Sequence, residues 1–450
     1  MKARDRVKIS QCMIVKNEEK NIRQALSWGK EVVSEQIVVD TGSTDRTVEI
    51  AEQMGAKVYH FSWIDDFAAA KNYAIEQATG EWIVFLDADE YFQPEAAQKL
   101  KFYVKSLHST RFHALLTGRV NIDNLGNVMA INTQCRVFRN HPNLRYKRRI
   151  HEYLASMDGS PMQMADAVDE LSMYHTGYGE EETKNKSGRN LKLIQMELTE
   201  DPDDFEMWGY LGQEYEEREM WEKADHAFRK AVELMPKSQR GHYDVSTSIT
   251  LLRLLEVQVC RPNPNIQDIL KVYEQATEGW PEEADYDYTM AKYFTRCGNF
   301  EEGETYLRRA LDILNTYGST VRSMILCGEI RKAYELLAIC CYNNGNMADC
   351  VKFTTTLLKE DAHLMSTLTV LLRAFKADEE TAKKGRDGIE SVLVFLGGSF
   401  YDFGQLKDRL FVLRAAMAAE YWGMVQRIRE TFAPEELAAV DKALGQGGKG

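Results

Sequence analysis

The sequence lacks three features that would assign it to a membrane, nucleic-acid-binding or disulfide-rich class. No apolar run reaches the roughly 18 residues that a membrane-spanning helix needs, and the first residues lead into an apolar strand without a signal-peptide core. The formal net charge of -13 argues against a nucleic-acid partner, which usually requires a basic face. The eight cysteines form no CxxC pair. We therefore expect reduced thiols, no membrane span and a cytoplasmic location.

The first part of the chain alternates short apolar strands with helical stretches. At 450 residues the chain is long enough for two or three domains. Strand alternation up to about residue 180 predicts a doubly wound, mostly parallel α/β sheet. Two later runs, 111–120 and 128–138, resemble an antiparallel pair, which makes the predicted sheet mixed. The four earlier strands are expected at 9–15, 36–40, 57–60 and 82–86, the last fully apolar and therefore central.

A helical repeat begins at about residue 203. One unit matches the tetratricopeptide spacing at Trp208, Leu211, Gly212, Tyr215, Ala224, Phe228, Ala231 and Pro236. Weaker matches follow at Ala291, Phe294, Gly298, Gly303, Leu307 and Ala310, and at Tyr334, Leu337, Ala338 and Gly345. One repeat cannot bury its apolar face alone, so the intervening helices are expected to stack as an array. We expect an α/β domain at 1–200, an all-α repeat domain at 201–445 and a disordered tail at 446–450.

Two acidic residues, Asp87 and Asp89, follow the most apolar strand with Ala88 between them. In an open α/β sheet, ligands bind beyond the carboxyl ends of the strands. Two close carboxylates there suit a hard divalent cation, Mg²⁺ or Mn²⁺, that also holds a diphosphate. The alternative is a solvated acidic turn, because so short a pattern often arises by chance.

The other strand ends favour the metal interpretation. The first ends in Val15-Lys16-Asn17-Glu18, where Asn17 is expected to cap a helix. The second ends in Asp40-Thr41-Gly42-Ser43-Thr44-Asp45, and the helix before the fourth strand carries Lys71-Asn72. Together with Asp87-Ala88-Asp89, these elements resemble family-2 glycosyltransferases of the GT-A fold.

That resemblance implies roles for particular residues. The first two strand ends would hold the nucleoside through Val15, Asn17, Glu18, Asp40 and Ser43, with Asp40 contacting the uridine portion. Lys71 and Asn72 would lie near the diphosphate, beside Asp87 and Ala88. Asp89 would be the principal metal ligand. Asp45 is equally well explained as an acid in the first turn of a helix.

A second block is basic. It runs through Arg136, Arg139, Arg145, Lys147, Arg148 and Arg149 to His151-Glu152, and is followed by His175-Thr176-Gly177-Tyr178, Lys186, Arg189 and Asn190. One or two of these cations would neutralise the leaving diphosphate; the alternative is an edge strand guarded by charge. His151 would be a third metal ligand or take part in acid/base chemistry, unless it is structural. Glu152 and Glu90 are the candidate bases.

The same block resembles a narrower group, family-2 transferases fused to tetratricopeptide repeats. This group includes the sublancin-type S-glycosyltransferases, which glycosylate bacteriocin peptides on cysteine or serine. The resemblance implies inverting transfer from a UDP-sugar to a Cys, Ser or Thr side chain of a peptide or protein bound by the repeats. The chain departs from the wider family because the Q/R-x-x-R-W motif of processive synthases and a clear Glu-Asp base motif are absent.

Two other functions remain open. One is a transferase acting on a cell-surface glycan or a lipid-linked acceptor, and the other is a non-enzymatic repeat scaffold with a nucleotide-binding domain. The intact Asp87-Ala88-Asp89 argues against the scaffold, because a decayed domain has no reason to keep paired acids at a strand end. A homodimer through the helical region is a further partnership compatible with the sequence.

Overall fold

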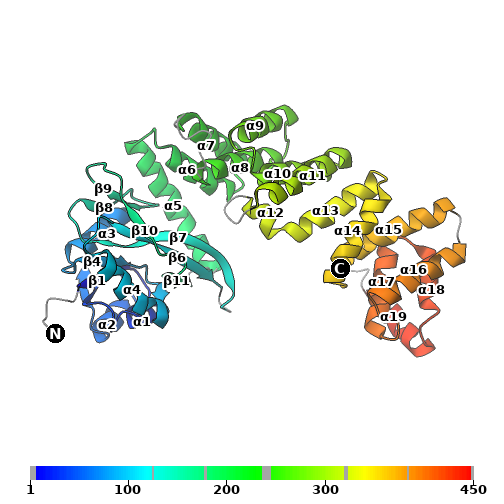
Figure 1. Cartoon of the computed structure of the whole chain (residues 1–450), viewed down its shortest axis with the longest axis horizontal. Helices are drawn as coiled ribbons and strands as arrows, with labels where there is room; N and C mark the ends of the chain where they lie inside the picture. The colour runs from blue at the N-terminus through cyan, green and yellow to red at the C-terminus, as the bar shows by residue number, and fades with distance from the viewer. Residues whose placement is uncertain are drawn as a thin grey trace. The chain divides into compact units, whose positions relative to one another are not determined.

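The computed structural model describes residues 7–123, 126–176, 180–235, 245–318, 323–382 and 385–446. Contacts divide the chain into two units, residues 1–218 and 219–450 (Figure 1). Pro236, Gly177, Tyr178 and positions 447–450 of the expected tail lie outside the described residues, as does the side chain of Lys186.

The first unit is built on a nine-stranded mixed sheet in the order β3-β2-β1-β4-β7-β6-β11-β5, with β10 beside β6. β1 pairs in parallel with β2 and β4, whereas β7 runs antiparallel to β4 and β6. The predicted doubly wound, mostly parallel mixed sheet is confirmed. The strands are β1 (Ile9–Val15), β2 (Glu35–Asp40), β3 (Lys57–His60), β4 (Trp82–Phe85), β5 (Glu90–Phe92), β6 (Ala114–Ile122), β7 (Val128–Arg139), β10 (Met164–Asp166) and β11 (Ser172–His175), and a separate hairpin joins β8 (Leu144–Lys147) to β9 (Tyr153–Ser156).

Helices cover both faces of the sheet because alternate strand residues point to opposite sides. Cys12 and Phe85 pack with α3 (Phe67–Glu76) and the β8–β9 hairpin, whereas Met13 packs with α1 (Ile22–Ser27) and α2 (Thr47–Gln53). Val84 packs with α4 (Pro94–Leu107). All four residues of β4 are buried, as its apolar sequence and central position predict.

The two remaining helices of the first unit are α5 (Glu180–Glu200) and α6 (Phe205–Glu216). The boundary between the two units lies at residue 218, whereas the change from strand to helix patterns in the sequence suggested a boundary at residue 200. The reason is that α6 packs against α5 and pairs with the segment after β8 through Arg148.

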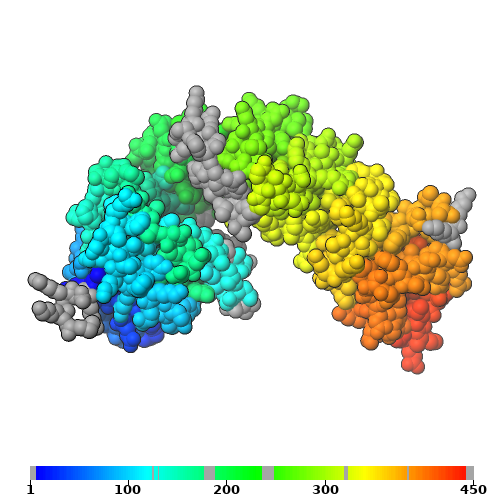
Figure 2. Space-filling view, viewed as in Figure 1, coloured from blue at the N-terminus to red at the C-terminus, as the bar shows by residue number. Residues whose placement is uncertain are grey.

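The second unit is all-helical, as predicted for a repeat array. In Figure 2 its colour changes gradually from green to red, so helices that are neighbours in sequence are neighbours in space. Gly298 and Gly345 each lie in the turn between the two helices of a pair. Their φ angles are 77° and 80°, a conformation that glycine adopts without steric cost. Its helices are α7 (Trp221–Leu234), α8 (Val245–Cys260), α9 (Ile266–Gly279), α10 (Ala284–Arg296), α11 (Phe300–Tyr317), α12 (Met324–Gly328), α13 (Ile330–Asn343), α14 (Met347–Glu360), α15 (Met365–Ala382), α16 (Gly385–Ser399), α17 (Leu406–Ala418), α18 (Trp422–Arg429) and α19 (Pro434–Gln446).

Two expectations from the sequence concern disulfide bonds and membrane-spanning helices. All eight cysteine thiols are free, as expected. Among the described residues, no helix combines the length and apolar character that a membrane span requires.

Candidate functional site

Three strand ends meet at one edge of the sheet in the first unit. Because β1 is parallel to both β2 and β4, Val15, Asp40 and the turn after Phe85 lie at the same carboxyl edge. The backbone N–H of Leu86 donates to the carbonyl of Cys12 at 3.2 Å, which keeps the chain in register up to Asp87. A cavity of about 400 Å³ opens at this edge.

Most of the predicted site residues line this cavity. They are Val15, Glu18, Lys71, Asp87, Ala88, Asp89, His151 and Glu152, joined by His175, Arg189 and Asn190 from the second block. The lining also includes residues that the sequence analysis did not assign: Ile14, Lys16, Thr41, Phe67 and Ile150. The strand-end rule could have found Lys16 and Thr41, since each directly follows a strand.

A buried network of opposite charges forms one wall of the cavity. Lys71 Nζ lies 3.2 Å from Asp87 Oδ1 and 2.7 Å from Glu152 Oε1. Arg136 Nη2 lies 2.6 Å from Asp87 Oδ2 and 2.7 Å from Glu90 Oε1. The side chains of Lys71 and Glu90 are 3% and 0% exposed, whereas that of Asp87 is 37% exposed. These charges compensate one another in a setting where an unpaired charge would be costly.

The network fixes the ionisation of its members. Burial raises the pKa of the Asp87 carboxyl, but Arg136 and Lys71 outweigh it and hold that pKa well below its usual range. Burial lowers the pKa of Lys71, yet Asp87 and Glu152 outweigh it and the pKa rises. Glu90 behaves differently, because burial and the neighbouring Asp87 raise its pKa against the opposing effect of Arg136. Asp87 is therefore a carboxylate with both oxygens already paired to cations.

Asp89 lies outside this network and faces a histidine. His175 Nε2 is 3.3 Å from Asp89 Oδ2, and His175 Nδ1 is 2.9 Å from Asn121 Oδ1. With Nδ1 donating to Asn121, a neutral imidazole presents an unprotonated Nε2 to the carboxylate. The unprotonated His175 Nε2 and the Asp89 carboxylate can then share a cation, either a proton or a metal ion.

The first two strand ends form an interlocked loop instead of a helix cap. The expectation that Asn17 caps a helix is wrong, because α1 begins at Ile22 and Asn17 has φ of 57°. Asn17 Oδ1 accepts from the N–H of Thr44 at 2.7 Å, while its own N–H donates to Ser43 Oγ at 2.9 Å. Asp40 accepts from the N–H groups of Gly42 and Ser43. Asn17, Asp40 and Ser43 therefore shape the loop and are absent from the cavity lining, whereas Glu18 reaches it.

Asp45 and Asn72 also have structural partners. Asp45 accepts from the N–H groups of Thr47 at 3.0 Å and Glu19 at 3.1 Å. It precedes α2, whose first-turn acid is Glu49, so the expectation of a first-turn acid is wrong. Asn72 Nδ2 donates to the carbonyl of Tyr146, and Asn72 Oδ1 accepts from the Tyr146 N–H, both at 2.9 Å. Asn72 thus joins α3 to β8 and is not among the residues that line the cavity; its contact with the donor stays a prediction.

Arg136 belongs to the ion network beside the cavity, whereas the other arginines of the basic run have partners elsewhere. Arg139 and Arg145 donate to backbone carbonyls, and Arg148 pairs with Asp204 and Glu206 of the α6 start. Arg149 pairs with Glu200. Arg148 and Arg149 thus bind acidic residues of α5 and of the α6 start, whereas Arg139 and Arg145 bind backbone carbonyls. β8, which carries Arg145, is an edge strand of the two-stranded sheet, so the interpretation of a charged edge strand stays open.

His151 is held by an aromatic ring. Its imidazole is stacked on Tyr210 of α6, with centroids 3.6 Å apart and planes inclined by 4°. Burial and the nearby Arg148 lower the pKa of His151 to about 4, although Glu152 acts in the opposite direction. The ring lines the cavity as a neutral group. Its ligand atoms do not group with those of Asp87 and Asp89 within metal-binding distance among the described residues, so the predicted three-residue metal site is not assembled.

One trio of acidic and thiol groups does occur in the described part of the second unit. Glu304, Cys341 and Asp349 have ligand atoms within 4.8 Å of one another. Arg308 donates to both carboxylates and to Cys341 Sγ. The guanidinium therefore occupies the position that a cation would take.

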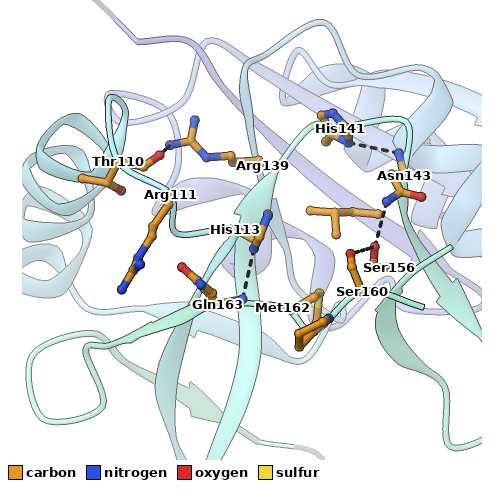
Figure 3. A pocket seen from close by; sticks show the side chains of 12 residues that line it. Thr110, Arg111, His113, Arg139, His141, Asn143, Ser156, Ser160, Met162 and Gln163 are labelled. Atoms are coloured by element: carbon orange, nitrogen blue, oxygen red, sulfur yellow. Dashed lines mark hydrogen bonds between the residues drawn. The ribbon is translucent and has the colours of Figure 1, made fainter. Parts of the chain in front are cut away.

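A second cavity of about 390 Å³ lies at the opposite edge of the sheet, where β4 begins beside Arg139 (Figure 3). Arg139 donates to the carbonyls of Leu107 and Thr110 at the end of α4. His113 Nδ1 accepts a backbone N–H in the same cavity. No carboxylate occurs among its described lining residues. It therefore lacks the acidic pair that distinguishes the cavity at the carboxyl edge.

Residues 10–160, which contain the paired acids and the strand ends described above, match the family model described as glycosyl transferase family 2. These residues are therefore similar to family-2 glycosyltransferases. The match covers the part of the first unit that contributes Lys71, Asp87, Asp89 and Glu152 to the cavity.

Similar proteins match the chain over part of their length. A TPR repeat-containing protein of Synechococcus elongatus is 35% identical over 215 residues, which cover 45% of this chain and 51% of that protein. The SPbeta prophage-derived glycosyltransferase SunS of Bacillus subtilis is 27% identical over 247 residues, covering 54% and 57%. The chain thus spans about half the length of these curated relatives. Among solved structures, S. aureus TarS aligns with 59% of this chain and 55% of its own, at 14% identity and a TM-score of 0.35.

Removing Arg136 should destabilise the first unit. In Arg136→Met, Asp87 and Glu90 lose their shared guanidinium while remaining in the network, and breaking a buried ion pair costs about 3–5 kcal/mol. Urea denaturation measures the loss. Arg111→Met removes the same charge from an exposed side chain and should change stability by less than about 0.5 kcal/mol. Equal stability of the two variants would contradict the network.

His151 should remain neutral over the physiological pH range. Because its folded pKa is near 4, below the ordinary value of about 6.5, the unfolded chain gains a proton between these values that the folded chain does not. Its contribution to stability therefore falls as the pH drops from about 6.5 to 4. The C2-proton NMR signal of His151, assigned with His151→Asn, should not shift between pH 8 and 5. A midpoint near 6.5 would show that the ring is not enclosed by Tyr210.

Proposed function

We propose that the chain is an inverting glycosyltransferase that transfers a sugar from a UDP-sugar to a Cys, Ser or Thr side chain of a peptide or protein. One observation carries the proposal: the Asp87–Asp89 turn opens into the cavity at the carboxyl edge of β1 and β4, within residues that match family 2. Similarity to the glycosyltransferase SunS supports the same reaction class.

The donor would lie across the strand ends. Val15, Glu18 and Thr41 line the part of the cavity beside β1 and β2, which suits the nucleoside. The diphosphate needs cations, and the charge of Lys71 is already balanced by Asp87 and Glu152. Lys16 and Arg189 line the cavity and form no ion pair within the described residues. These two side chains are the proposed diphosphate contacts.

Asp89 and His175 are the residues that fit a divalent cation. Their facing oxygen and nitrogen atoms, 3.3 Å apart, are a donor set that suits Mn²⁺ well and Mg²⁺ less well. Asp87 is a weaker ligand because Lys71 and Arg136 occupy its oxygens. A bound cation would supply charge stabilisation for the diphosphate.

Glu152 is the proposed base. Glu90, the other candidate, is 0% exposed and is bound by Arg136, whereas Glu152 lines the cavity with its side chain 17% exposed. As the acceptor oxygen or sulfur forms its bond to the anomeric carbon, Glu152 takes the acceptor proton and the bond to UDP breaks, its electrons leaving with UDP. A cysteine thiol, with a pKa of about 8.5, needs less help from a base than a hydroxyl.

The acceptor class rests on the repeat unit. Helical repeats stack into extended surfaces that suit a chain-like ligand, and the array after residue 219 provides one. A peptide or protein acceptor is accordingly proposed for this unit.

Asp89→Ala should abolish transfer without unfolding the protein. The change removes a cavity carboxylate and no core packing, and loss of its charge stabilisation should lower turnover roughly 100-fold or more. UDP release from a panel of UDP-sugars with Mn²⁺ or Mg²⁺ provides the measurement. Asp169→Ala, at an exposed position, should match the parent. Activity of Asp89→Ala within tenfold of the parent would remove Asp89 from the site, and no release by the parent with any donor would contradict the proposed function.

A further inference from the structure

The segment that carries the proposed base has a strained backbone. Arg148 and His151 have φ of 72° and 51°, in the left-handed region that non-glycine residues rarely adopt. Such a residue is strained and persists only where its surroundings determine the conformation. Residues 148–152 therefore need support from outside the segment.

Helix α6 supplies much of that support. Arg148 Nε lies 2.9 Å from Asp204 Oδ2, and Arg148 Nη2 lies 2.5 Å from Glu206 Oε2. Asp204 also caps α6 by accepting the N–H groups of Glu206 and Met207. One turn further on, Tyr210 stacks face to face on His151. Both strained residues are thus held by α6 or its N-cap.

The support from α5 is of a different kind. Glu197 accepts the backbone N–H of Arg149 at 2.9 Å, and the Arg149 carbonyl accepts the N–H of Phe67. These bonds tie the middle of the segment to α5 and to the start of α3. They leave the orientation of His151 and Glu152, at its end, to the stack on Tyr210 and the ion pair with Lys71.

Helix α6 belongs to both parts of the chain. By sequence it is the first helix of the first tetratricopeptide unit, with Trp208, Leu211, Gly212 and Tyr215 at signature positions. By contact it belongs to the first unit, residues 1–218. The helix that opens the repeat is therefore also the helix that holds the segment bearing Glu152.

We propose that α6 is a positioning element of the active site, in which Asp204, Glu206 and Tyr210 hold residues 148–152 so that Glu152 remains beside Lys71 and faces the cavity. This inference rests on the proposed role of Glu152. Displacement of α6 would change turnover more than donor binding, because misplacing a reacting group by about 1 Å can cost roughly 100-fold in rate.

Tyr210 provides the sharpest test in the full-length protein. Tyr210→Ala should lower kcat for UDP release by about tenfold or more, as expected for a displaced catalytic group, while the KM for the UDP-sugar stays within about twofold because no donor contact changes. Tyr210→Phe keeps the ring and should restore kcat. Tyr215→Ala makes the same truncation on the same helix, where the hydroxyl accepts from Gln195 of α5, and should leave kcat unchanged.

Hydrogen exchange of residues 149–152 separates this inference from the proposed function. Exchange should accelerate in Tyr210→Ala but not in Tyr215→Ala, even if no donor supports turnover. Glu206→Gln, a milder change at the Arg148 contact, replaces Tyr210→Ala if that variant does not fold. Exchange as slow in the Tyr210 variant as in the control would overturn the proposal. So would faster exchange with unchanged kcat, because α6 would then hold the segment without positioning the base.

Discussion

The ion network of Lys71, Asp87, Arg136, Glu90 and Glu152 is the constraint on which the cavity depends. Its members come from α3, the turn after β4, β7, β5 and the segment after β8. Charges buried in a medium of low dielectric persist only when they are paired. The network therefore fixes five separate pieces of backbone relative to one another, and it sets the position of one cavity wall before any ligand binds.

This arrangement divides the paired acids into two roles. Asp87 is held ionised by Lys71 and Arg136 and is part of the cavity wall, whereas Asp89 lies outside the network and faces His175. The separation explains how two carboxylates of one short motif can act differently, since each takes its properties from its neighbours and not from the motif. It also assigns Lys71 to Glu152 and Asp87 and leaves Lys16 and Arg189 for an anionic ligand.

The fold could be predicted from local patterns. The apolar run 82–86 indicated a central strand, and β1 and β3 have the predicted bounds. These predictions succeed because the pattern of apolar and polar residues within a short segment indicates its secondary structure and burial. The strand-end rule also predicted that Asp87 and Asp89 would project into a cleft, and the family resemblance predicted that Lys71 would lie near them; all three line one cavity. Glycine positions such as Gly298 and Gly345 marked the turns of the helical array for the same local reason.

What the sequence could not show are partners that the fold brings together from distant positions. From the sequence alone, Asn72 is a plausible ligand contact. In the structure its side-chain amide binds the backbone of Tyr146, 74 residues away. From the sequence alone, Arg148 is one cation of a basic run. In the structure it forms ion pairs with Asp204 and Glu206. His151 next to Glu152 suggested a metal ligand, yet its ring is enclosed by Tyr210. In each case the sequence gives the chemistry of a side chain, whereas tertiary contacts decide whether that chemistry is available to a ligand.

The central claim is that the cavity at the carboxyl edge binds the donor with Asp89 and His175 at the cation and with Asp87 retained by the network. A crystal structure of the full chain with UDP and Mn²⁺, measured with anomalous scattering from manganese, tests it most directly. The account predicts a manganese peak in contact with the Asp89 carboxylate and the His175 imidazole, with Lys71 still between Asp87 and Glu152. A peak bound to Asp87 with Lys71 displaced, or UDP outside this cavity, would contradict the account.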